Sequence, residues 1–206
     1  KISTVDIAFA RELGFTIKLL GIAKLKDQVI EARVHPTLVP TESPIAQVNG
    51  VYNAIHLVGD AVGDIVLYGQ GAGSLPTASA VVGDIIDLAR NRMYGSFARV
   101  PATSFQWESR KPLAIKPMAE IDSRYYLRCM VKDDPGVLST ISGILGKYGI
   151  SISSVLQKGR KQGQPVPLVI LTHCSSERGM QSALQDINAL SIVSEPTTLL
   201  RMEGIE

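Results

Sequence analysis

Residues 124–155 read RYYLRCMVKDDPGVLSTISGILGKYGISISSV. The apolar run at residues 125–131 predicts a strand, and the Asp-Asp-Pro-Gly sequence at 133–136 predicts a loop. From residue 137 to 148 the apolar side chains recur at helical spacing. Residues 150–156 then alternate Ile and Ser, which is typical of a half-buried strand. The segment therefore reads strand, loop, helix, strand.

The sequence after residue 156 completes this pattern. A second apolar run at residues 166–172 predicts a strand, and Ser175-Ser176-Glu177 is typical of the start of a helix, which we expect to reach about residue 190. Residues 193–200 predict a closing strand. The order β-α-β-β-α-β is that of the ferredoxin-like fold. We therefore expect residues 123–202 to form a four-stranded antiparallel sheet with two helices on one face.

The first 92 residues predict a second α/β segment. Ser3 is expected to cap a helix, because Asp6 follows three residues later, and Gly14 suits the end of that helix. Short turns separate the predicted strands, which indicates an antiparallel or mixed sheet. His35-Pro36 predicts that the second strand is an edge strand or contains a bulge. The predicted strands are residues 15–25, 29–39, 52–58 and 65–68.

A glycine-rich loop at residues 69–73 leads into a predicted helix at 77–92. The apolar positions of this helix form one face, which we expect to lose its partner sheet in this chain. Residues 93–122 contain three prolines and predict a linker, with Trp107 as a packing anchor. The fold class is therefore α/β (α+β): part of a mixed-sheet domain, then a ferredoxin-like domain.

Composition excludes several classes of function. The formal net charge is only +2 and the basic residues are scattered, which argues against a nucleic-acid partner. No apolar run approaches the roughly 18 residues of a membrane span, and the three histidines have no metal-ligand spacing. Cys129 and Cys174 favour two reduced thiols in a cytoplasmic protein, although a redox link between neighbouring strands is an alternative.

Three motifs together resemble the later part of the catalytic region of homoserine dehydrogenases. They are ARELGFTIKLLGIA at residues 10–23, VNGVYNA at 48–54 and GQGAGSLPTASAV at 69–81. The resemblance covers residues 1–92. It implies part of a substrate and dimer-contact domain, whose last helix returns to a cofactor domain.

The second resemblance, carried by RYYLR at 124–128, DDPGVL at 133–138 and ISISSV at 150–155, is to ACT regulatory domains. An ACT domain after such a catalytic segment is the arrangement of bacterial homoserine dehydrogenases with a single function. The resemblance implies reduction of L-aspartate 4-semialdehyde to L-homoserine with NADP or NAD, on the route to threonine, methionine and isoleucine. The nicotinamide cofactor carries the hydride in such a reaction.

The family's Gly-x-Gly-x-x-Gly turn and its Gly-x-Asp-x-x-x-Lys segment do not occur in this sequence. Lys18, Lys24 and Lys26 do not lie in that motif, and we interpret them as surface lysines. No catalytic residue is therefore assigned, and we expect the chain to be inactive by itself.

Gly71 and Gly73 are the candidate cofactor-binding residues. Their loop follows a strand and opens a helix, so its N–H groups can face a polar ligand. The alternative is an ordinary tight turn, because the spacing Gly-x-Gly-x-Gly is not a dinucleotide fingerprint. The resemblance implies that this loop closes on the cofactor, with Gly73 near it.

The loop after the first ACT strand is the candidate effector site. The N–H groups of Gly136 and Val137 can meet a carboxylate, and Asp133 can meet an ammonium group. Alternatively, Asp133 or Asp134 caps the following helix. The two roles are compatible.

The resemblance to paired ACT domains implies further effector contacts from the second strand: Ile152, Ser153 and Gln157. Strand side chains alternate, so Ile152 and Ser153 cannot both face the ligand. The resemblance implies L-threonine as the effector and a homo-oligomer, dimer or tetramer, formed partly by ACT pairing. The alternatives are a stand-alone amino-acid-binding ACT module and a purely structural dimerisation piece.

Overall fold

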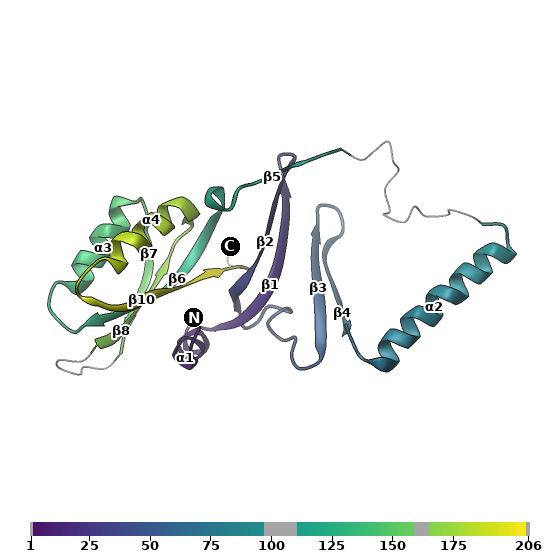
Figure 1. The fold of residues 1–206 in the computed structure, drawn as a ribbon, viewed down its shortest axis with the longest axis horizontal. Coiled ribbons are helices and arrows are strands. Elements are labelled where there is room, and N and C mark those ends of the chain that lie inside the picture. The colour runs from purple at the N-terminus through teal and green to yellow at the C-terminus, as the bar shows by residue number, and fades with distance from the viewer. Residues whose placement is uncertain (1, 97–110, 159–164, 205–206) are drawn as a thin grey trace. The chain divides into compact units, whose positions relative to one another are not determined.

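The computed structural model describes residues 2–96, 111–158 and 165–204 (Figure 1). The chain packs as two compact units, one formed by Lys1–Ala46 with Leu113–Glu206 and the other by Gln47–Pro112. The first predicted segment, residues 1–92, is thus shared between the two units, and its boundaries as a domain stay a prediction.

The C-terminal part of the first unit has the predicted ferredoxin-like fold. Its sheet has the order β10-β6-β8-β7, and each neighbouring pair is antiparallel. Helices α3 and α4 bury Ile141, Leu145 and Ile187 against this sheet in one apolar core. The elements are β6 (Asp122–Lys132), α3 (Val137–Lys147), β7 (Ile152–Gln157), β8 (Pro165–Thr172), α4 (Glu177–Asn188) and β10 (Val193–Met202).

A hairpin from the N-terminal segment extends this sheet. Strands β1 (Phe15–Lys26) and β2 (Val29–Pro40) pair antiparallel, and β2 pairs parallel with β10 through Thr37–Arg201 and Leu38–Met202. Two short strands, β5 (Ala114–Ile115) and β9 (Ser175–Ser176), pair with β2 and β6. The result is a mixed sheet, as predicted, but one shared between the N-terminal hairpin and the ferredoxin-like part.

No bulge occurs at His35-Pro36, but the expectation of an edge holds locally, because β10 pairs with β2 only from Thr37 onward. Strand β2 lies between β1 and β10, and its register with β1 runs without a shift from Phe15–Pro40 to Lys26–Val29. Proline lacks an N–H group to donate. The strand tolerates it because the pairing with β10 begins only at Thr37, just after Pro36.

Helix α1 (Thr4–Glu12) covers the face of the sheet opposite to α3 and α4 (Figure 1). Its Phe9 and Ala10 are buried in a second apolar cluster. The predicted helix start is confirmed, because Asp6 accepts a hydrogen bond of 2.8 Å from the Ser3 N–H. The sheet residues of this cluster are Leu38, Tyr126, Val169, Leu171, Leu200 and Met202.

The second unit holds a hairpin and a long helix. Strands β3 (Tyr52–Gly59) and β4 (Gly63–Gln70) pair antiparallel, and α2 (Ser74–Met93) follows. None of the side chains of α2 is buried in the described structure, so its predicted apolar face, including Val81 and Ile85, is exposed. Trp107 lies outside the described residues.

Candidate functional site

The glycine loop of the second unit connects the end of β4 to the start of α2. The hairpin register places Asn53 of β3 opposite Gly69, so two of the sequence motifs lie side by side. Tyr52 and Tyr68 stack across the same hairpin, with ring centroids 4.8 Å apart. The loop therefore rests against an ordered hairpin.

Gly71 and Gly73 differ in what a side chain would meet. A Cβ atom at Gly71 would lie 2.6 Å from Nδ2 of Asn53, the end of a flexible side chain that would have to move. At Gly73 the nearest contact is an ordinary 3.4 Å to Pro76, but φ is +120°, so the constraint is the backbone conformation. Gly73 is also the N-cap of α2 and provides no side-chain cap. The loop thus allows a close approach to the backbone at the start of a 20-residue helix.

The effector loop lies between β6 and α3. Gln157, the last residue of β7, donates a hydrogen bond of 3.3 Å from Nε2 to Oδ1 of Asp133. Two of the predicted effector residues, 24 positions apart in sequence, are therefore in contact. Both polar groups are exposed, so an incoming ligand can reach them.

Gly136 is the N-cap of α3, in the left-handed conformation with φ of +91°. Gly136 has no side chain with which to cap this helix, so the capping role considered for Asp133 or Asp134 stays a prediction. Val137 buries its side chain in the core, and only its backbone N–H remains for a ligand. That N–H makes a long 3.4 Å bond to the Asp134 carbonyl.

Ile152 does not join this cluster within one chain. It begins β7, opposite Thr172, whereas Gln157 ends the strand opposite Leu168. Gln157 lies five positions after Ile152 along the strand, which is a distance of roughly 16 Å. Ile152 packs against the core beneath α3 and α4, while Ser153 is exposed, as the alternation of side chains predicts.

Comparisons with known proteins identify both parts. Residues 1–86 match the family model for homoserine dehydrogenase, and residues 125–191 match that for the ACT domain. A homoserine dehydrogenase from Neisseria gonorrhoeae is 45% identical over 205 residues, covering 100% of this chain and 47% of the relative. One from Pseudomonas aeruginosa is 42% identical, covering 100% of this chain and 48% of the relative.

Over its whole length this chain is similar to homoserine dehydrogenases.

Solved structures agree with this assignment. A homoserine dehydrogenase from Thiobacillus denitrificans superposes with a TM-score of 0.87 at 42% identity, covering 98% of this chain and 46% of that one. A homoserine dehydrogenase from Staphylococcus aureus gives a TM-score of 0.62 at 27% identity, covering 99% of this chain and 46% of that one. The chain spans about half the length of the curated relatives it matches.

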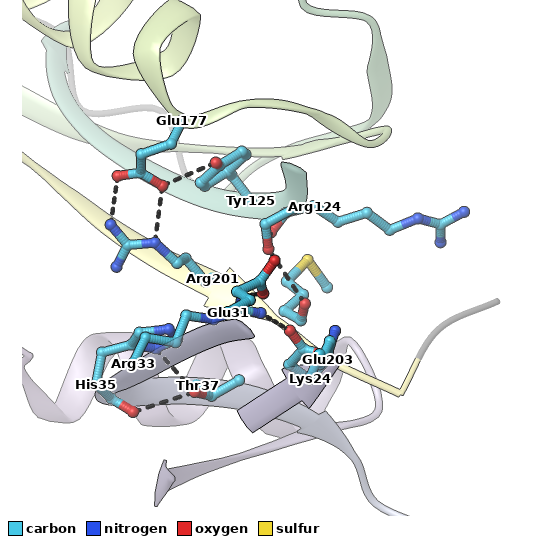
Figure 2. A network of polar contacts seen from close by, with 12 residues as sticks. Lys24, Glu31, Arg33, His35, Thr37, Arg124, Tyr125, Glu177, Arg201 and Glu203 are labelled. Atoms are coloured by element: carbon cyan, nitrogen blue, oxygen red, sulfur yellow. Dashed lines mark hydrogen bonds and ion pairs between the residues drawn. The ribbon is translucent and has the colours of Figure 1, made fainter. Parts of the chain in front are cut away.

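Sequence reasoning missed a polar network where the ACT sheet meets the β1–β2 hairpin (Figure 2). Glu177 is buried and accepts hydrogen bonds from the Tyr125 hydroxyl and from Nε of Arg201, each 2.8 Å long. Burial acts to raise the pKa of Glu177, but bonds from Arg201, Gln181 and Tyr125 hold it below its usual value. In the sequence, Glu177 had indicated only the start of a helix.

The hairpin side of the network is also charged. Glu203, just after β10, pairs with Lys24 of β1 at 2.8 Å and with Arg33 of β2. Arg33 also pairs with Glu31, and its side chain is almost fully buried. Lys24, interpreted from sequence as a surface lysine, is half exposed and ion-paired. Through Glu203, these ion pairs join the β1–β2 hairpin to the segment that follows β10.

Both cysteines are free thiols, Cys129 buried and Cys174 exposed, so the alternative of a redox link is not realised here. Among the described helices, none combines the length and apolar character needed to cross a membrane. No cluster of three or more potential metal ligands occurs within the described ranges.

Proposed function

We propose that this chain forms part of an NAD(P)-dependent homoserine dehydrogenase, which interconverts L-aspartate 4-semialdehyde and L-homoserine in the biosynthesis of threonine, methionine and isoleucine. The observation that carries the proposal is similarity to a homoserine dehydrogenase at 45% identity over the whole chain. The Thiobacillus denitrificans structure supports it with the same fold.

We propose that Gly71 and Gly73 form one wall of the cofactor site. The nicotinamide nucleotide, NADP or NAD, supplies the hydride when bound. The two glycines fit this role because they leave the loop backbone without side chains and because α2 begins without a side-chain cap. We assign no catalytic group to this chain, and we infer that the 206 residues alone do not turn over substrate.

We propose that the ACT domain binds an amino acid, L-threonine, as a feedback effector. The carboxylate of Asp133 meets the ammonium group, with Gln157 beside it. The backbone N–H groups of Gly136 and Val137 meet the effector carboxylate at the uncapped start of α3. Because Ile152 lies at the far end of β7, it contacts the effector only across a pair of subunits.

The enzyme is accordingly proposed to be a homo-oligomer, a dimer or a tetramer, assembled partly through ACT pairing. We place it in the cytoplasm, which agrees with its two free thiols. Nucleic-acid and membrane partners are not part of the proposal.

Turnover tests the catalytic part. The complete product of the gene is assayed for oxidation of NADPH or NADH by aspartate 4-semialdehyde, with and without threonine. We expect turnover that threonine inhibits, and no turnover from the 206-residue chain. A complete product without turnover would refute the proposal.

Calorimetric titration of this chain tests the effector part. We expect threonine to release heat, Asp133→Asn to weaken binding at least tenfold, and Asp134→Asn to leave it unchanged. Heat from other amino acids but not from threonine would refute the effector assignment. It would favour the alternative of an amino-acid-binding module with another ligand.

A further inference from the structure

His35 lies on β2, two residues before the parallel pairing with β10 begins at Thr37. Only 9% of its surface is exposed. Nδ1 of the ring lies 3.2 Å from the Pro36 carbonyl oxygen and 3.0 Å from Oγ1 of Thr37. The Thr37 hydroxyl donates to the His35 carbonyl, and the Pro36 carbonyl can only accept, so Nδ1 carries the proton of the neutral ring.

The other ring nitrogen has a different environment. Nε2 is buried and has no hydrogen-bond partner among the described groups of the chain. A neutral ring with its proton on Nδ1 presents only a lone pair there. Protonation would place an N–H group and a positive charge at a buried position without an acceptor, which is unfavourable.

The charges around His35 oppose protonation as well (Figure 2). Arg33 of β2 and Arg201 of β10 act on the imidazole from two strands and disfavour its cation, and Glu203 favours it. The carboxylates of the network already have cationic partners. Glu177 of α4 binds Arg201, Glu31 of β2 binds Arg33, and Glu203 is shared between Arg33 and Lys24 of β1.

Two further titratable or charged residues come from β6 in the same network. They are Tyr125, whose hydroxyl donates to Glu177, and Arg124, which takes part through its backbone carbonyl while its guanidinium points away from the network (Figure 2). Neither is bonded to the imidazole among the described contacts, which are to Pro36 and Thr37. The described contacts of the network therefore join three cationic side chains to three carboxylates, and none of these carboxylates is bonded to the ring.

We propose that the junction between β2 and β10 is proton-sensitive and that His35 is its sensor. Protonation of the ring destabilises the pairing of Thr37 and Leu38 with Arg201 and Met202. This pairing joins the ACT sheet to the hairpin of the homoserine dehydrogenase segment, so acidification loosens the link between the two. The inference concerns the chain itself and does not depend on the proposed reaction.

The direction of the pH effect follows from linkage. Burial lowers the pKa of His35, the bond to Pro36 partly offsets this, and Arg201 and Arg33 lower it further. The unfolded chain therefore binds the proton more readily than the folded chain. The contribution of neutral His35 to stability is fully present above the pKa of histidine in the unfolded chain, about 6.5. It declines as the pH falls from that value toward the pKa of His35 in the folded chain.

Amide hydrogen exchange at residues 37–38 and 201–202, corrected for intrinsic exchange rates, tests the proposal between about pH 7.5 and pH 5. We expect protection in the wild-type chain to fall by as much as about tenfold per pH unit, the limit for one proton. His35→Asn keeps a donor near the position of Nδ1 but does not titrate, so it should remove this dependence. His173→Asn, at an exposed histidine of the same unit, should behave like the wild type.

A pH dependence that persists unchanged in His35→Asn would overturn the proposal. If that variant does not fold, nuclear magnetic resonance titration of the wild-type imidazole decides the matter. A midpoint below the ordinary histidine value of about 6.5, together with loss of protection at the junction, supports the proposal. A midpoint at or above that value overturns it.

Discussion

Asp6 of α1 and Arg128 of β6, 122 residues apart in sequence, form a buried two-pronged ion pair with distances of 2.6 Å from Nε to Oδ1 and 3.2 Å from Nη2 to Oδ2. The Tyr126 hydroxyl donates a further bond of 3.1 Å to Asp6, and the Ser3 N–H one of 2.8 Å. Burial acts to raise the pKa of Asp6, but the bonds from Arg128 and Ser3 and the charge of Arg128 lower it overall. The pair fixes α1 on the ACT sheet.

Asp6→Ala should destabilise the chain by about 3–5 kcal/mol, because it leaves the Arg128 guanidinium buried without its charge partner. Urea unfolding followed by circular dichroism measures the change. Glu12→Gln is the matched control on the same helix, since the Glu12–Lys158 pair is exposed. We expect it to cost at most about 1 kcal/mol. Equal losses in the two variants would contradict the role assigned to the buried pair.

Acid should destabilise the chain through Glu177. The pKa of Glu177 is lowered in the folded chain. Its contribution to the free energy of unfolding is therefore present above the pKa of the unfolded chain, about 4.3, and is lost as the pH falls through the pKa of the folded chain. Near neutral pH, Glu177→Gln should cost about 1.5–3 kcal/mol, the usual worth of a hydrogen bond to a charged group. Urea titrations from about pH 6 to pH 3 should show a smaller loss on acidification for the variant than for the wild type. Parallel pH profiles would be evidence against this assignment.

Two glycines of the α3 region should respond oppositely to alanine. Gly136 has φ of +91° and open space around its Cβ position, so Gly136→Ala should cost about 1–2 kcal/mol through backbone strain alone. Gly143, exposed within α3, has open space and no positive φ. Gly143→Ala should therefore stabilise the chain by about 0.5–1 kcal/mol. Thermal unfolding compares the two, and a stabilising Gly136→Ala would disprove the left-handed conformation.

The two thiols should differ in reactivity. Burial raises the pKa of Cys129, while a hydrogen bond from Thr197 and the charge of Arg128 act against this, and Cys174 is exposed. In the folded chain a chromogenic disulfide reagent should modify Cys174 rapidly and Cys129 only after urea is added. Cys174→Ser should abolish the rapid phase. Rapid reaction of both thiols in the native chain would contradict the burial of Cys129.

The ferredoxin-like part could be predicted from sequence because its signals are local. Apolar runs mark β6 and β8, the Asp-Asp-Pro-Gly sequence marks a loop, and Ser176 caps α4 by accepting a bond from the Gly179 N–H. The resemblance to ACT domains also led to the pair Asp133 and Gln157, which the structure brings into contact.

The packing between distant segments could not be predicted in this way. The capping role of Asp6 can be read from Ser3, three residues earlier in the sequence. Its buried ion pair with Arg128 cannot, because no local pattern connects these two residues. Likewise, the parallel pairing of β2 with β10 involves only Thr37 and Leu38 on the β2 side. Two residues are too few to leave a periodic signature in sequence.

The position of α1 has a practical meaning for dissecting the polypeptide. A gene shortened to begin at residue 123 would encode every strand and helix expected of an ACT module. It would nevertheless leave Tyr126, Val169 and Leu200 uncovered and strip Arg128 of its counter-ion. Such a truncated product would be prone to aggregation, so the regulatory half of this protein is best isolated with its first helix still attached.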